Sequence, residues 1–279
     1  RSLWITPNYA FVADGQAGME IYNINDPSLP IPAGDFKTSY VKKCDVVGSY
    51  AYAATWETGL QVLNVQDPDV PIWLGSVDTP GKAEDVKAIG NYAYIADRQS
   101  GLISINVATP SAPTIADSYD TPGFAKALAV FGTYCYVADY NSIQIFNIGN
   151  PYNIGFVGSF TPTGYPVDVF VEGTRLYVAA SGAGCHIYDL IDPANPSFAG
   201  TYASTGSVKA VVASGNYAYL ADDVADAVII NVTDPANPAF VSDYEVEDAV
   251  SDIYFSSNFL HVSHQFGGYT VLNVINKSN

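Results

Sequence analysis

The chain has 279 residues, 48% hydrophobic and only 14% charged, so it holds enough apolar material for a packed core and lacks the composition of a disordered segment. Eleven Lys and Arg residues stand against 28 Asp and Glu, a formal net charge of −17 that would repel a nucleic-acid backbone or an anionic lipid surface. No apolar run approaches the roughly 20 residues that cross a bilayer, so we expect a globular protein with no nucleic-acid partner and no membrane insertion.

Seven related aromatic strings follow one another along the chain, and the first three read YAFVAD, YAYAAT and YAYIAD. They begin at Tyr9, Tyr50, Tyr92, Tyr134, Arg175, Tyr217 and Phe259, at steps of 41 or 42 residues. A second ladder keeps the same step and consists of Asn23, Asn64, Asn106, Asn147, Asp189, Asn231 and Asn273. Two independent registers agree, so the chain consists of seven copies of one unit.

Each unit offers four runs of about five residues with period-two alternation, rich in β-branched and aromatic residues and broken by Gly, Pro, Asn or Asp. We name these runs strands A to D. No segment has ten residues at helical spacing, so we expect an all-β chain. A four-stranded antiparallel sheet repeated about every 42 residues is typical of a β-propeller. We predict one seven-bladed propeller domain over residues 1–279, with blades starting near residues 1, 42, 84, 126, 167, 209 and 251.

The last copy stops at VLNVINKSN, after strand C. We therefore expect a three-stranded seventh blade. A strand resembling PxxxGSYxTPG before residue 1 would complete it, and otherwise the sheet edge is open to another chain.

The third copy reads VKAIGNYAYIADRQSGLISINVATPSAP and resembles the LVIVD repeat, a propeller-forming motif of bacterial and archaeal surface or secreted proteins. The resemblance spans essentially the whole chain. It implies the propeller fold and an extracellular, cell-surface or periplasmic location, and it brings no defined catalytic residues.

Charged residues recur at the two positions that open strand A, where the D-to-A loops reach the central channel. Five of the eleven basic residues fall there, with four carboxylates. The candidates for binding are Lys43, Asp85, Lys126, Asp168, Lys209 and Asp252. They predict a polar pocket for a small charged ligand; alternatively, neighbouring blades neutralise each other through ion pairs.

The B-to-C loops share that face in propellers and vary more between copies. Their candidates for ligand binding are Trp56, Glu57, Arg98, Tyr140 and Phe266. Aromatic rings beside carboxylates and amides suit a sugar, whose C–H faces stack on rings while its hydroxyls bind planar polar groups. Alternatively, these are ordinary surface aromatics that cap the blades.

The remaining reactive side chains favour structural roles. Asp14, Asp97, Asp139 and Asp222 end strand B in four blades and are expected to accept hydrogen bonds in turns. A structural calcium ion is the alternative, although no D-x-D-x-D-G loop supports it and we predict no cofactor. His264, which replaces the turn Asp in the last blade, is the candidate general base. The three cysteines are expected to be small buried apolar residues.

We predict a non-catalytic, secreted or cell-surface propeller that binds a glycan or a protein partner on the face with the D-to-A and B-to-C loops. The regular copies support this, because enzymes usually carry long insertions that hold catalytic groups. The alternatives are a polysaccharide lyase or hydrolase at the channel mouth, using Lys126, Asp168, Lys209, His264 and Tyr140, or a structural module of a larger surface protein.

Overall fold

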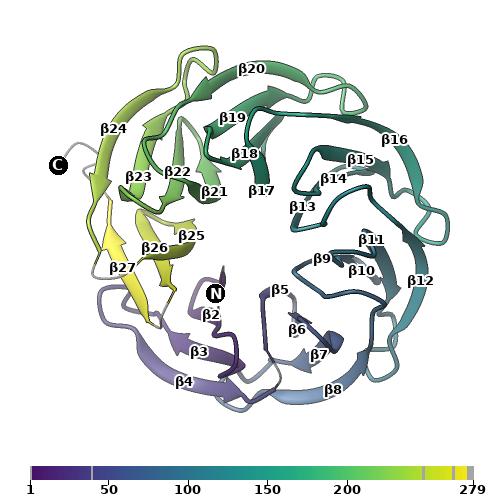
Figure 1. Ribbon diagram of the computed structural model, residues 1–279. Coiled ribbons are helices and arrows are strands. Elements are labelled where there is room, and N and C mark those ends of the chain that lie inside the picture. The colour runs from purple at the N-terminus through teal and green to yellow at the C-terminus, as the bar shows by residue number, and fades with distance from the viewer. Residues whose placement is uncertain (1, 39, 247–248, 266–267, 275–279) are drawn as a thin grey trace.

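A computed structural model describes residues 2–38, 40–246, 249–265 and 268–274 as a ring of seven antiparallel sheets (Figure 1). Blades 1 to 4 contain β1 (Ser2–Ile5), β2 (Tyr9–Ala13), β3 (Met19–Asn23), β4 (Ile31–Phe36), β5 (Lys43–Val47), β6 (Tyr50–Thr55), β7 (Gly59–Asn64), β8 (Ile72–Val77), β9 (Asp85–Ile89), β10 (Tyr92–Ala96), β11 (Leu102–Asn106), β12 (Thr114–Tyr119), β13 (Ala127–Phe131), β14 (Tyr134–Ala138), β15 (Ile143–Asn147) and β16 (Gly155–Phe160). Blades 5 to 7 contain β17 (Tyr165–Glu172), β18 (Arg175–Ser181), β19 (Gly184–Asp189), β20 (Ser197–Tyr202), β21 (Val208–Ser214), β22 (Tyr217–Asp222), β23 (Asp226–Asn231), β24 (Ala239–Tyr244), β25 (Val250–Ser256), β26 (Phe259–His264) and β27 (Tyr269–Asn273).

Every blade follows the chain from the hub outwards, so strand A lies innermost and strand D lies at the rim. Six sheets have four strands and the seventh has three among the described residues. The predicted all-β, seven-bladed propeller with a three-stranded last blade is confirmed. No helix in the described part of the chain is long and apolar enough to span a membrane.

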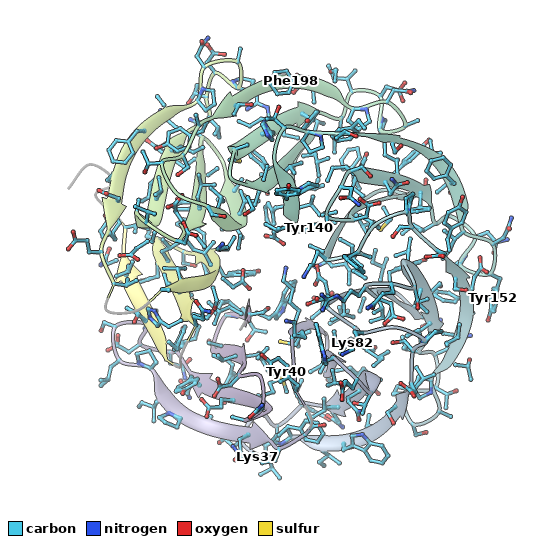
Figure 2. The ribbon with its side chains drawn as sticks, viewed as in Figure 1. Lys37, Tyr40, Lys82, Tyr140, Tyr152 and Phe198 are labelled. Atoms are coloured by element: carbon cyan, nitrogen blue, oxygen red, sulfur yellow. The ribbon has the colours of Figure 1, made fainter. Side chains whose placement is uncertain are left out.

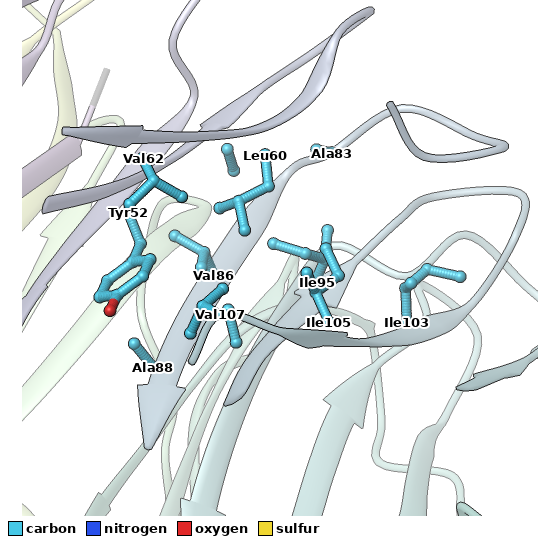
Figure 3. Packing of buried hydrophobic residues seen from close by; sticks show 12 residues of the cluster. Tyr52, Leu60, Val62, Ala83, Val86, Ala88, Ile95, Ile103, Ile105 and Val107 are labelled. Atoms are coloured by element: carbon cyan, nitrogen blue, oxygen red, sulfur yellow. The ribbon is translucent and has the colours of Figure 1, made fainter. Parts of the chain in front are cut away.

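The blades are held together by apolar side chains on both faces of each sheet. Between blades 2 and 3, Tyr52, Leu60 and Val62 pack against Val86 and Ile95 (Figure 3). The predicted period-two alternation is wrong for strands B and C, which are buried at nearly every position. Because they are covered on both sides, they read as nearly continuous apolar runs. This double burial explains why YAYIAD recurs as a buried strand in each unit.

The two recurring polar positions end strands by forming turns. Five members of the asparagine ladder accept a hydrogen bond from the backbone N–H two residues later, at 2.8–3.0 Å; they are Asn23, Asn64, Asn106, Asn147 and Asn231. The predicted turn role is also confirmed for Asp139 and Asp222, which accept the N–H groups of Asn141 and Val224. Asp97 differs, because it binds the preceding D-to-A loop at Thr79 Oγ1 (2.6 Å) and Gly81 N (2.7 Å).

The ring closes where blade 7 meets blade 1. The Asp252 carboxylate accepts a hydrogen bond from the Leu3 N–H at 3.0 Å, and Trp4 and Tyr254 meet edge to face with ring centroids 5.7 Å apart. Further from the hub, the aromatic rings of Tyr22 in β3 and Tyr269 in β27 pack against each other. Polar and aromatic contacts therefore join the first and last blades of the chain.

All three cysteines, Cys44, Cys135 and Cys185, are free and buried, as predicted. Burial raises the pKa of each thiol, that of Cys185 to about 12. The thiols therefore stay protonated and pack as small apolar groups.

The buried side chain of His261 should make the stability of the protein sensitive to acid. Its side chain is 1% exposed, shares a hydrogen bond with the Tyr269 hydroxyl at 2.5 Å, and has its pKa lowered by burial to about 4. Below about pH 6.5, the ordinary pKa of histidine, His261 is protonated in the unfolded chain but stays neutral in the folded chain. The free energy of unfolding is therefore not reduced by this group above pH 6.5, and it falls by about 3 kcal/mol as the pH is lowered to 4.

We expect His261→Tyr to remove this loss, because Tyr52, Tyr94 and Tyr136 occupy the same position in other blades. Denaturant unfolding at pH 7, 6, 5 and 4 gives the stability difference between variant and wild type, in which contributions from other titrating groups cancel. The difference should favour the variant increasingly toward pH 4. A difference that does not change with pH would contradict the prediction.

Candidate functional site

Four aspartates at the hub bind the inner strand of the next blade. Strand A has no sheet partner on its channel side, so its N–H groups there need acceptors. The pairs are Asp45 with Ala88 N (2.7 Å), Asp85 with Leu128 N (2.9 Å), Asp168 with Val211 N (3.0 Å) and Asp252 with Leu3 N (3.0 Å). The first three join positions 43 residues apart, one blade to the next.

Lys43 of blade 2 crosses the hub and reaches the carboxylate of Asp168 in blade 5. Its Nζ lies 2.9 Å from Asp168 Oδ1 and 3.5 Å from Asp85 Oδ2. Burial opposes the charge of Lys43, but the carboxylates of Asp168, Asp85 and Asp252 outweigh it and raise its pKa well above the usual value. Burial in turn raises the pKa of Asp85 to about 6, against the opposing effect of Lys43.

The hub contains an open cavity of about 160 Å³, which the ion pair itself helps to line. Its lining also includes apolar residues of the inner strands, together with Trp4 and Lys87. Lys87 Nζ lies 4.2 Å from the Trp4 ring centroid and 3.5 Å from Asp45. Among the described residues no group of three or more His, Cys, Asp or Glu side chains is arranged to hold a metal ion.

A second charged group lies on the loop face over blades 2 to 4, and we call it the cationic cluster: Lys42, Lys82, Arg98 and Lys126 around Trp56 and Glu84. Glu84 is 7% exposed, and the nitrogens of Lys42, Lys126 and Arg98 lie 3.2, 3.3 and 3.7 Å from its carboxylate. Lys42, Lys82 and Arg98 approach within 4.5–4.9 Å of the Trp56 ring centroid.

The cationic cluster carries more positive than negative charge. Its four cations meet two carboxylates, Glu84 and the exposed Glu57, whose Oε1 lies 3.3 Å from Lys82 Nζ. Two positive charges are therefore in excess, on a chain whose net charge is −17. An anion that approaches this face is attracted locally although the whole protein repels it.

Exposed aromatic rings continue the same face toward blade 5. Tyr140 and Tyr165 stack with ring centroids 4.9 Å apart and an interplanar angle of 14°, and Tyr165 is 53% exposed. Tyr140 lies beside the central opening, Tyr40 and Lys82 lie between the opening and the rim, and Lys37, Tyr152 and Phe198 lie at the rim (Figure 2). The cationic cluster and the exposed rings thus lie inside the rim of the propeller.

The repeats themselves identify the family. The LVIVD repeat model matches six consecutive segments, at residues 1–38, 40–79, 80–121, 122–162, 163–204 and 205–246. The chain belongs to the LVIVD repeat family. None of the curated proteins matches it.

Solved structures similar to this LVIVD propeller share its fold at low sequence identity. A protein from Lactobacillus plantarum has a TM-score of 0.84 and 13% identity over 95% of this chain and 91% of that chain. The β-propeller domain of Myceliophteria thermophila Cps50 (Swd1) has a TM-score of 0.81 and 11% identity, over 98% of this chain and 95% of that chain. A chain of a mitotic checkpoint complex has a TM-score of 0.82 and 12% identity, over 98% of this chain and 89% of that chain.

The structure places the predicted channel-mouth residues in three separate locations. Lys43, Asp85, Asp168 and Asp252 meet at the hub, whereas Lys126 belongs to the cationic cluster. Lys209 lies apart on blade 6, where its Nζ is 3.3 Å from Asp223. Lys42–Glu84 and Lys43–Asp85 are ion pairs between neighbouring blades, which was the alternative to a ligand pocket.

The predicted loop residues also separate. Trp56, Glu57 and Arg98 contribute to the cationic cluster, while Phe266 falls outside the described residues. Tyr140 stacks on Tyr165, and its turn is joined to the loop of Phe124, a neighbour of Arg98, where Phe124 N donates to Asp139 O at 2.6 Å. Trp56 is surrounded by the cations of Lys42, Lys82 and Arg98 rather than by the amides that a sugar site would offer.

The residues of the enzymatic alternative do not share one site. His264 is buried and shares a hydrogen bond with Thr270 Oγ1 at 2.8 Å, while Lys126, Asp168 and Lys209 have partners on different blades. The geometry gives no support to a base at His264 acting with these groups.

Sequence reasoning missed Tyr40, Lys82, Phe124 and Tyr165. The first three directly precede Val41, Ala83 and Ala125, which bridge to the B-to-C turns at Gly15, Trp56 and Arg98. Their shared place in the repeat was a usable signal.

Replacing Lys43 tests the electrostatics of the hub. We expect Lys43→Met to lower the free energy of unfolding by about 3 kcal/mol at pH 7, because it leaves buried carboxylates without their cation. Part of the loss should return at pH 5, because carboxylates with raised pKa values take up protons in the folded state first. Denaturant unfolding measures both effects.

Lys209→Met is the matched control and should cost less than about 1 kcal/mol, since Lys209 forms an exposed pair. A loss for Lys43→Met as small as the loss for this control would contradict a stabilising role for the hub ion pair.

Proposed function

We propose that this LVIVD propeller is a non-catalytic binding module for an acidic glycan, which lies over the cationic cluster and the Tyr140–Tyr165 pair. The observation that carries the proposal is the concentration of four of the eleven basic residues around Trp56 and Glu84. Such a cluster supplies charge-assisted hydrogen bonds to carboxylates or sulfates. The extracellular, cell-surface or periplasmic location implied by the family resemblance belongs to the same proposal.

The neighbouring rings favour a glycan over an acidic protein segment. Tyr140 and Tyr165 offer a stacked, exposed aromatic surface beside the charges, and sugar rings pack their C–H faces on such surfaces. The loops are short, so the site is open and shallow, which suits a chain that extends across several blades. The experiment below distinguishes an acidic glycan from an acidic protein partner.

Binding of three soluble polymers tests the proposal: polygalacturonate, neutral dextran and poly-glutamate, titrated calorimetrically at low salt. We expect polygalacturonate to bind more tightly than poly-glutamate, dextran not to bind, and affinity to fall with added NaCl as charges are screened. Preference for poly-glutamate would favour a protein partner, and equal binding of dextran would exclude charge recognition. Either result would overturn the proposal.

Two variants locate the site. Lys42→Gln and Lys126→Gln should each weaken polygalacturonate binding up to about fivefold, because each removes one positive charge beside the ligand, an interaction of up to about 1 kcal/mol. Lys37→Gln is the control, since Lys37 lies at the rim and its Nζ is 3.2 Å from Asp35. Equal losses in all three variants would indicate non-specific attraction.

A further inference from the structure

Arg98 has an unusual backbone for its residue type. It begins the turn between β10 and β11 with φ of 48°, in the left-handed region where Gly15 (φ 53°) occupies the same position of blade 1. L-residues with a long side chain rarely adopt this conformation. Two backbone hydrogen bonds with Ala125 hold it, at 3.1 and 2.9 Å. The fold therefore accepts a strained arginine at a position where glycine would fit without strain.

Two aromatic rings fix the guanidinium of Arg98. Its Cζ lies 4.9 Å from the Trp56 ring centroid and 5.3 Å from that of Phe124. Both rings come from neighbouring blades and attract the cation by its charge and its flat shape. The side chain keeps 27% exposure, so part of it reaches the surface.

The guanidinium has few partners for its N–H groups. Nε is buried and has no hydrogen-bond partner, and the nearest carboxylate oxygen, Glu84 Oε1, lies 3.7 Å from Nη1, beyond hydrogen-bond distance. Arg175 contrasts with it, since its Nη1 donates to Val232 O at 2.8 Å and its Nε lies 3.7 Å from Asp189. Stacking rather than hydrogen bonding holds Arg98, which leaves its terminal N–H groups to a ligand.

We propose that Arg98 is the specificity-determining residue of the glycan site, and that its planar fork receives the carboxylate of a uronate sugar. This inference rests on the proposed function and adds the group that the site recognises. A carboxylate matches the fork with two parallel hydrogen bonds, which a lysine ammonium cannot supply. Lys42 and Lys126 already bind Glu84 and provide the surrounding positive charge.

The test uses calorimetric titration with trigalacturonate, its methyl ester, and a sulfated oligosaccharide that carries no carboxylate. The wild type should bind the free acid at least about tenfold more tightly than the ester. Arg98→Lys keeps the charge and should lose at least about tenfold in affinity for the free acid, while binding of the ester stays the same. If Arg98 had only a structural role, Arg98→Lys would change the affinities for the free acid and for the ester together.

The variant Arg98→Gly tests whether a loss of binding results from a loss of the folded state. Glycine suits the backbone at φ of 48°, so its melting temperature should equal or exceed that of the wild type while binding of the free acid is lost. Arg175→Lys is the matched control and should leave binding unchanged.

The outcomes separate the two proposals. A wild type that binds neither the free acid nor the sulfated probe more tightly than the ester overturns the proposed function itself. A wild type that prefers the free acid, with Arg98→Lys binding equally well, overturns only the role of Arg98. Equal affinity for the sulfated probe, with an equal loss in Arg98→Lys, overturns the choice of carboxylate.

Discussion

The inner strand of each blade is an edge strand inside the protein, and its unpaired N–H groups constrain the rest of the ring. An edge that faces bulk water is satisfied by water, but the hub is narrow and partly closed. Aspartates of one blade supply the acceptors for the next, in blades 2, 3, 5 and 7. The same contact, from Asp252 to Leu3, joins the last blade to the first. Hydrogen bonding at the hub and apolar packing further out therefore act together to fix the angle between blades.

These acceptors create an electrostatic problem that one lysine offsets. Asp85, Asp168 and Asp252 converge on the hub, and like charges at short range destabilise one another. Lys43 lies among all three and reaches Asp168 across the axis. The chain thus uses its scarce basic residues at two places, the hub and the loop face. At the hub carboxylates outnumber the cation, and on the loop face cations outnumber carboxylates, which separates a structural charge cluster from one suited to a ligand.

The repeat period was sufficient to predict the fold because every copy reports on the same packing environment. Strand count, blade boundaries and turn residues follow from two ladders of side chains. The candidate site was only partly predictable, because Lys42 and Lys43 are adjacent in sequence and both belong to the charged pair of positions that opens strand A. Side chains of adjacent strand residues point in different directions, so Lys43 enters the hub while Lys42 joins Trp56 and Glu84. The contacts of Arg98 with Trp56 and Phe124 come from three different blades, and no spacing within one copy specifies which residue of the next blade lies beside it.

Regular copies also explain how such a fold acquires a site without insertions. In blades 1 to 3 the B-to-C turn lies beside the following D-to-A loop, as the bridges at Gly15, Trp56 and Arg98 show. Where the turn holds Gly15 the position is only structural, because no side chain extends from it. Where it holds Trp56, Arg98 or Tyr140, the turn presents a side chain to a partner one blade away. A few substitutions at equivalent positions thus convert three neighbouring turns into a continuous surface, and the rigid blades below keep its charges and rings in register.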